Sequence, residues 1–136
     1  MESLPHRYPF RFVDRTVERT GAGCGRVAAV LSAGSWGACG GPLPAGLVAE
    51  LMAQAALLLS GAGPEPALGA VLAGLSGVVV ERAPEPGDAL TVRVVVAGRM
   101  GSVVKFDAAA FGADGTRIAA GSITVRQETT ARETTA

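Results

Sequence analysis

The chain has 136 residues, a length that fits one domain. Twelve basic and twelve acidic residues cancel, and no run of lysine or arginine occurs, which argues against nucleic-acid binding through phosphate contacts. Glycine, proline and glutamate interrupt the apolar stretches before they reach about 20 residues, so no membrane-spanning helix is expected.

Few residues in the chain are suited to metals or disulfides. Cys24 and Cys39 are too few for a disulfide framework, and with His6 as the single histidine a structural zinc site is not expected either. We therefore expect no metal and no cofactor. The first ten residues lack the apolar core of a secretory signal, which predicts a cytoplasmic protein. A hydrophobic fraction of 49% with 18% charged residues favours an oligomer, because a small monomer would expose much apolar surface.

The first half of the chain predicts two strands and one helix. Strands are expected over 11–18 and 24–31, joined by a glycine-rich turn at 21–23. A helix is expected over 44–61, since Pro44 suits a helix start and Gly61 a helix end. Its residues are apolar on most sides, which is typical of a buried helix. Glu50 is the acid within it, and Gln54, four residues later, shares its face.

The second half predicts four strands. They are expected over 75–82, 89–97, 102–111 and 116–126, with turns at 83–88, 98–101 and 112–115. In the strand over 89–97, Val92, Val94 and Val96 alternate onto one face. Two strands, one helix and four strands predict an α+β fold in which a single helix lies across a curved antiparallel sheet. We expect one domain over 1–126 and a flexible polar tail over 127–136.

Three stretches of the sequence resemble the FabZ-type β-hydroxyacyl-acyl-carrier-protein dehydratases, a family with the hot-dog fold. They read LPHRYPFRFVDR at 4–15, PAGLVAELMAQ at 44–54 and ERAPEPGDAL at 81–90, and their spacing also fits. The resemblance covers residues 4–126. It implies one long central helix wrapped by a curved antiparallel sheet, and a homodimer or larger oligomer that binds an acyl-ACP or acyl-CoA thioester. It also implies the lyase chemistry of fatty acid or polyketide biosynthesis.

The resemblance also assigns roles to residues at the helix. In the family, a histidine and a glutamate from opposite subunits flank the substrate. The histidine takes the Cα proton, the glutamate helps to expel the β-hydroxyl as water, and a backbone N–H at the helix start holds the thioester carbonyl. By likeness, Glu50 stands at the acid and Gln54 at the neighbouring amide. Ala45, followed by Gly46, stands at the N–H donor, where the family prefers glycine.

The sequence departs from the family in the loop before the helix. Counted back without gaps from Pro44, the position of the family's histidine is Trp36, and the loop reads SWGACGG without the family's Pro-Gly element. Trp36 then lines the site in place of the histidine. Cys39 is either a reactive thiol near a helix start or, more ordinarily, a small loop residue. His6 lies in the first matching stretch and is not the family's catalytic histidine.

Three functions remain open at this point. The first is an acyl-thioester-binding, dehydratase-like protein that is impaired on its own or completed by the histidine of an active paralogue in a heterodimer. The second is an acyl-CoA or acyl-ACP thioesterase that uses Glu50. The third is a working dehydratase whose base comes from a realigned loop or from His6. Glu50 also has a structural interpretation, as an acid paired with Arg7, Arg11 or Arg15.

Overall fold

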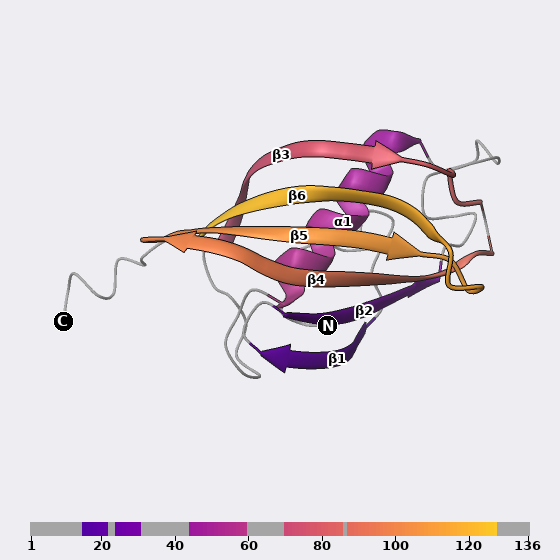
Figure 1. Cartoon of the computed structure of the whole chain (residues 1–136), viewed down its shortest axis with the longest axis horizontal. Coiled ribbons are helices and arrows are strands. Elements are labelled where there is room, and N and C mark those ends of the chain that lie inside the picture. The colour runs from indigo at the N-terminus through magenta and orange to yellow at the C-terminus, as the bar shows by residue number, and fades with distance from the viewer. Residues whose placement is uncertain (1–14, 22–23, 31–43, 60–69, 86, 128–136) are drawn as a thin grey trace.

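The computed structural model describes residues 15–21, 24–30, 44–59, 70–85 and 87–127. One helix, α1, packs against a six-stranded sheet that curves around it (Figure 1). In chain order the elements are β1 Arg15–Gly21, β2 Cys24–Val30, α1 Ala45–Leu59, β3 Ala70–Val80, β4 Ala89–Met100, β5 Val103–Phe111 and β6 Arg117–Gln127. This arrangement confirms the α+β prediction and the order of two strands, one helix and four strands. Within the described ranges, no helix has the length and apolar character needed to cross a bilayer.

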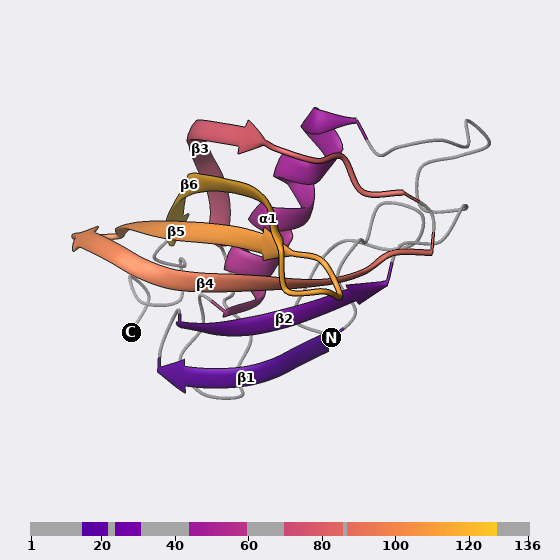
Figure 2. The same ribbon diagram turned by 45° about the vertical axis from the view of Figure 1, so that its right-hand side comes forward.

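The strand order of the sheet places β3 far from its neighbours in sequence. The order is β1-β2-β4-β5-β6-β3, and every adjacent pair is antiparallel. The chain leaves β2, passes through α1 and returns at the opposite edge, so β1 and β3 form the two edges of the sheet. Figure 2 shows these edges on either side of the helix, with β4, β5 and β6 between them.

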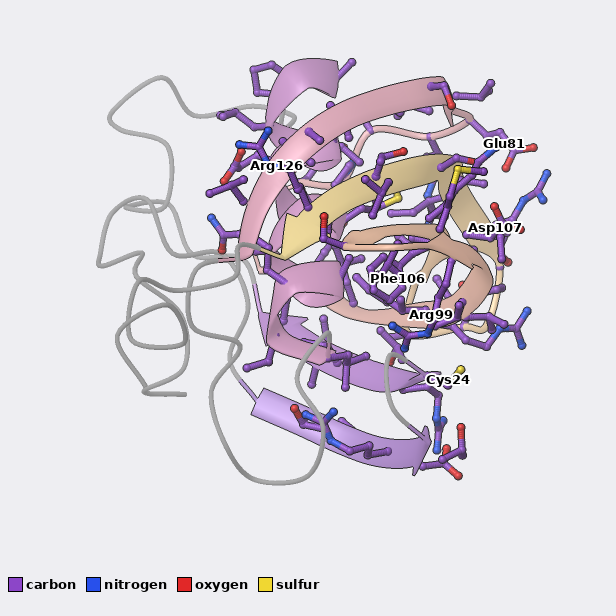
Figure 3. The ribbon with its side chains drawn as sticks, turned by 90° about the vertical axis from the view of Figure 1, so that its left-hand side faces the viewer. Cys24, Glu81, Arg99, Phe106, Asp107 and Arg126 are labelled. Carbon is purple, nitrogen blue, oxygen red and sulfur yellow. The ribbon has the colours of Figure 1, made fainter. Side chains whose placement is uncertain are left out.

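The core lies between α1 and the concave face of the sheet. Alternation in β4 buries Val92 and Val94 completely and packs Val96 against the core, as predicted from its sequence. Phe106 of β5 is fully buried and lies on the helix side of the sheet in Figure 3. From the helix, three large apolar side chains are fully buried: Leu51, Met52 and Leu59. Burial of such side chains stabilises the fold by about 1.5–3 kcal/mol each.

The β4–β5 connection is tighter than predicted. A turn was expected over 98–101, but Gly98 pairs with Lys105 and β4 continues to Met100 after a register shift that follows Val96. The turn itself is Gly101 with Ser102, and Gly101 has a φ of 60°. A glycine with positive φ at the first turn position is typical of a two-residue type II′ hairpin, whose twist matches that of the strands. The extra residue of the bulge hid this register in the sequence.

The β5–β6 hairpin follows its prediction. The N–H of Gly112 donates to the carbonyl oxygen of Thr116 at 2.9 Å, and Gly115 has a φ of 84°. The Asp114 carboxylate accepts a 3.0 Å hydrogen bond from the Thr116 N–H. This bond is the main reason that the pKa of Asp114 lies below its ordinary value.

The predicted strand boundaries were less accurate at β3 and β1. β3 begins at Ala70 rather than Leu75, because its first residues pair with the end of β6, a long-range contact with no local signal. β3 ends at Val80 instead of Arg82, where the N–H groups of Glu81 and Arg82 both donate to the carbonyl oxygen of Ile118. β1 begins at Arg15 and runs to Gly21, beyond the predicted end at Glu18, while residues 11–14 lie outside the described ranges.

Candidate functional site

The start of α1 presents backbone N–H groups. The carbonyl oxygen of Pro44 accepts the N–H groups of Leu47 and Val48 at 2.9 and 3.1 Å, so helical hydrogen bonding begins at Pro44 as predicted. The N–H groups of Ala45 and Gly46 belong to the first turn, whose donors have no acceptor within a helix. Both residues are exposed, and the first turn contains no acidic residue. This helix end therefore carries a partial positive charge that its own side chains do not neutralise.

Glu50 and Gln54 form a polar pair on the same helix. The Gln54 side chain is fully buried, and its Nε2 donates to Oε2 of Glu50 at 3.1 Å. The bond confirms that the two residues share a face. Gly46 precedes Glu50 by the same four-residue step, so it lies on that face too, and a Cβ at Gly46 would meet no atom within 4 Å. Glu50 is only partly buried, which leaves part of it accessible.

The pair and the helix start are close together. Each helical residue advances about 1.5 Å along the axis, so the backbone of Glu50 lies about 6 Å from that of Gly46 in this direction. A group bound at the helix start would therefore have a partly exposed carboxylate on the same helix face, one turn further along α1. This arrangement can polarise a carbonyl and, at the same time, exchange a proton with an adjacent carbon substituent.

The other end of α1 is fixed by a residue that the sequence analysis did not single out. Arg19 of β1 donates from Nη1 to the carbonyl oxygen of Leu59 at 3.1 Å and from Nη2 to that of Leu58 at 3.2 Å. The last turn of the helix has no basic residue of its own. Arg19 lies about 40 residues earlier in the chain, so only the fold brings it to these carbonyls. It anchors the element that carries Glu50.

The stretch over 81–90 joins β3 to β4 and contacts β6. Arg117 donates from Nε and Nη2 to the two carboxylate oxygens of Glu81 at 3.0 and 3.2 Å. These hydrogen bonds hold the pKa of Glu81 below its ordinary value. Asp88 accepts the N–H of Glu85 at 2.8 Å and closes the predicted turn. Glu81 lies on the convex side of the sheet, away from α1 (Figure 3). The described part of this stretch thus forms a turn and an ion pair with β6.

Three hollows lined by described residues lie on the convex face of the sheet, on the side opposite α1. Their volumes are about 360, 420 and 320 Å³. Arg93 lines all three, and Glu50 lines none of them. They are therefore separate from the polar pair on the helix. In the residues that the structure describes, no three His, Cys, Asp or Glu side chains are placed to hold a metal ion.

The remaining predicted site residues lie outside the described ranges. These are His6, Trp36 and Cys39, together with Arg7 and Arg11; for Arg15 only the backbone is described. Pairing of Glu50 with one of these arginines therefore stays a prediction. Cys24 is a free, partly buried cysteine at the start of β2. Of the predicted site, the structure thus describes Ala45, Gly46, Glu50 and Gln54, all on α1.

No family model matches this chain. One curated protein decides the family. The 3-hydroxyacyl-[acyl-carrier-protein] dehydratase FabZ of Acidiphilium cryptum is 37% identical over 119 residues, which cover 81% of this chain and 72% of that protein. The chain belongs to the FabZ dehydratase family. This confirms the resemblance inferred from the three stretches of sequence.

Solved structures show that this FabZ-family chain has the predicted hot-dog fold. The dehydratase heterocomplex ApeI:P of Xenorhabdus doucetiae matches with a TM-score of 0.74 and 17% identity, over 98% of this chain and 93% of that one. The smu.793 protein of Streptococcus mutans, bound to acetyl CoA, matches with a TM-score of 0.68 and 16% identity, over 92% of this chain and 95% of that one. A hypothetical thioesterase of Streptococcus pneumoniae with coenzyme A matches with a TM-score of 0.62 and 16% identity, over 86% of this chain and 87% of that one.

Proposed function

We propose that this FabZ-family chain binds acyl thioesters and is catalytically impaired unless a partner subunit supplies a histidine. The observation that carries the proposal is the Glu50–Gln54 pair, held at 3.1 Å on the helix face that leads to the N–H of Gly46. In this proposal, Glu50 is the acid of the family's site and the helix start is its carbonyl-binding end. The sequence has tryptophan at position 36, where the family's histidine is expected, and its single histidine is His6.

The geometry divides the proposed chemistry between two parts of α1. The N–H groups of Ala45 and Gly46 hold the thioester carbonyl, where negative charge develops as the Cα proton leaves. Glu50, oriented by Gln54, protonates the β-hydroxyl as it departs as water. A positioned general base typically contributes about 10²–10⁴-fold in rate. Its loss raises the barrier by about 3–5 kcal/mol, which one carboxylate placed for the acid role does not recover.

The β3 edge supports the accompanying proposal of a dimer. Leu72 and Leu75 pair with Val125 and Ile123, which are fully buried on the concave face, yet these leucines remain 40% and 44% exposed. β3 contains no charged residue and no proline, the features that usually protect a sheet edge. A second subunit that adds its own strand at β3 would cover this apolar strip and bring another helix beside α1. That subunit is either a second copy or a histidine-bearing FabZ paralogue.

The first test is hydration of a short enoyl thioester, followed by the loss of enoyl absorbance. We expect the purified chain to be at least 100-fold slower than a histidine-bearing FabZ dehydratase, and mixing with such a paralogue from the same genome to raise the rate. Glu50→Gln in this chain should abolish the increase in hydration rate that this chain brings to the mixture. Full activity of the chain alone, unaffected by Glu50→Gln, would contradict the proposal.

Trp36→His provides the matched gain-of-function variant. If position 36 is the place of the missing base, this variant should increase the hydration rate of the chain by about 10-fold or more, part of the usual effect of a general base. The double variant Trp36→His/Glu50→Gln should return to the original rate. An unchanged rate in Trp36→His, with thioester binding intact, would mean that the loop does not hold position 36 beside the substrate.

Thioester hydrolysis is a second candidate, favoured by the partly exposed Glu50 near a helix start without acidic side chains. Here the helix start would polarise the carbonyl, and Glu50 would act as nucleophile or activate water. Release of free thiol from saturated acyl-CoA distinguishes the two reactions, because hydration of an enoyl thioester releases none. Thiol release that Glu50→Gln abolishes, without loss of enoyl absorbance, would favour the thioesterase.

A further inference from the structure

A hollow of about 420 Å³ lies on the convex face, where the β5–β6 hairpin meets the sheet. In Figure 2 this hairpin passes in front of β4 toward β2. The hollow is lined by residues of β2, β4, β5 and the hairpin: Arg26, Thr91, Arg93, Phe111, Gly112, Ala113 and Gly115. Its volume lies within the usual range of small-molecule sites, about 300–1,000 Å³. Two of these described residues are arginines and none is acidic, so the hollow is a candidate site for an anion.

The two arginines stand opposite each other on β2 and β4. Arg26 and Arg93 are direct partners in the pairing of these strands, and the Cβ atoms of such partners lie about 4.5–5.5 Å apart. Like charges in this position are destabilising unless an opposite charge offsets them. Glu18 offsets one of them, since its Oε1 accepts a hydrogen bond from Nε of Arg26 at 2.8 Å. Two cations and one anion leave this group of three residues with a net positive charge.

Most hydrogen-bond donors of the two guanidinium groups are free. The Arg93 guanidinium lies over the Phe111 ring, with its carbon atom 5.0 Å from the ring centre. Among the described residues, the Arg93 side chain forms no hydrogen bond or ion pair, and the Arg26 side chain donates only from Nε. An arginine that stacks on an aromatic ring can still bind an oxyanion through two parallel N–H groups. The ring therefore orients Arg93 and leaves its donors available to a ligand.

The other residues of the hollow add a neutral donor and no competing acid. Thr91 is the direct partner of Phe111 and lies two residues before Arg93, so its hydroxyl is on the same face as the arginines. Asp114 is the acid of the hairpin, but it does not line the hollow, and its carboxylate accepts the N–H of Thr116 at 3.0 Å. The hollow thus combines positive charge with free donors, the combination that an oxyanion needs.

We propose that this hollow binds a phosphate group, held by Arg26 and Arg93. A phosphate monoester carries about −1.5 to −2 charges at pH 7 and three strong acceptor oxygens, which match two guanidinium groups. A carboxylate has one charge and two oxygens, which a single arginine satisfies. The space between Phe111 and the hairpin takes the organic part of a small phosphate ester. Because the hollow lies on the side of the sheet opposite α1, the inference goes beyond the proposed function and does not depend on Glu50.

The test is a titration of the full chain with inorganic phosphate, followed by phosphorus NMR at constant ionic strength. We expect Arg93→Gln and Arg26→Gln each to weaken binding about 10-fold or more, because each removes hydrogen bonds to a charged group. Arg93→Lys keeps the charge but not the planar fork, so its loss should be smaller. Acetate should compete with phosphate only weakly. Absence of phosphate binding, binding that neither glutamine variant weakens, or equal affinity for acetate would overturn the proposal.

Lys105→Gln is the matched control. Lys105 is exposed on the same face of β5 and loses the same charge, but it lines none of the three hollows. Phosphate binding should therefore not change. An equal loss in Lys105→Gln would show that net charge, and not the Arg26–Arg93 pair, attracts the anion, and it would also overturn the proposal. Circular dichroism of each variant, with unchanged melting, separates loss of binding from loss of fold.

Coenzyme A, as a second probe, identifies the molecule that carries the phosphate. Displacement of inorganic phosphate by coenzyme A, with weaker displacement in Arg93→Gln, would assign the site to the carrier of a thioester. Phosphate binding without such displacement would assign it to a separate phosphate ester. Both results support the site. Glu50→Gln should leave phosphate binding unchanged, so failure of the proposed function and failure of this inference are distinguishable.

Discussion

At the scale of single residues, Gly121 of β6 packs closely against Val78 of β3. A Cβ added there would lie 2.8 Å from Cγ2 and 3.1 Å from Cα of Val78, so both a side chain and a backbone would have to move. We expect Gly121→Ala to lower the free energy of unfolding by about 1–3 kcal/mol, the usual cost of overpacking. Urea denaturation of the purified variant measures this change.

Gly98→Ala is the control for this prediction. Gly98 is also a strand glycine, in β4, but a Cβ there would meet no atom within 4 Å, and its φ is not positive. Its unfolding free energy should stay within about 0.5 kcal/mol of the wild type, as for most surface substitutions. Equal losses in the two variants would mean that β3 does not lie against β6 at Gly121 as the structure shows.

At the scale of elements, Arg19 connects β1 to the end of α1. Replacing it with glutamine removes the positive charge from the helix end and leaves a shorter side chain to donate hydrogen bonds. This should lower the free energy of unfolding by about 1–2 kcal/mol. Arg19→Lys keeps the charge and loses the two-pronged contact, so its loss should be smaller. Thermal and urea unfolding of both variants check the order.

The exposed Arg26–Glu18 pair supplies the comparison for Arg19. Its side chains are 47% and 46% exposed, and pairs of this kind contribute about 0–1 kcal/mol. Arg26→Gln should therefore destabilise the protein less than Arg19→Gln. The reverse order would show that contact with the Leu58 and Leu59 carbonyls does not stabilise the helix.

The sequence predicted those elements whose signals are local. Pro44 and the apolar run after it predicted α1, and alternation of Val92, Val94 and Val96 predicted the buried face of β4. Glu50 and Gln54 were predicted to share a face because helical spacing alone decides it. In contrast, the start of β3 depends on its pairing with β6, and the placement of Arg19 depends on a contact across the fold. No local pattern encodes either one.

At the scale of the whole molecule, the two edges of the sheet differ in how they are protected. β1 carries Glu18 and Arg19 and has two register shifts along its pairing with β2, both of which disfavour a further strand. β3 has no charge, and Val71, Leu72, Leu75 and Val79 are each at least 40% exposed. We therefore expect association at β3 and not at β1.

Leu75→Lys tests this asymmetry, with Val17→Lys of β1 as its match, because the two side chains are 44% and 43% exposed. A lysine at Leu75 would bury an unpaired charge beneath an added strand, so the assembly should lose half of its mass, whereas Val17→Lys should leave it unchanged. A mass unaffected by Leu75→Lys would show that the exposed leucines of β3 are not covered by another subunit. Because each Glu50 is proposed to work beside a neighbouring subunit, enoyl-thioester hydration by a mixture with a histidine-bearing paralogue should then fall with Leu75→Lys and persist in Val17→Lys.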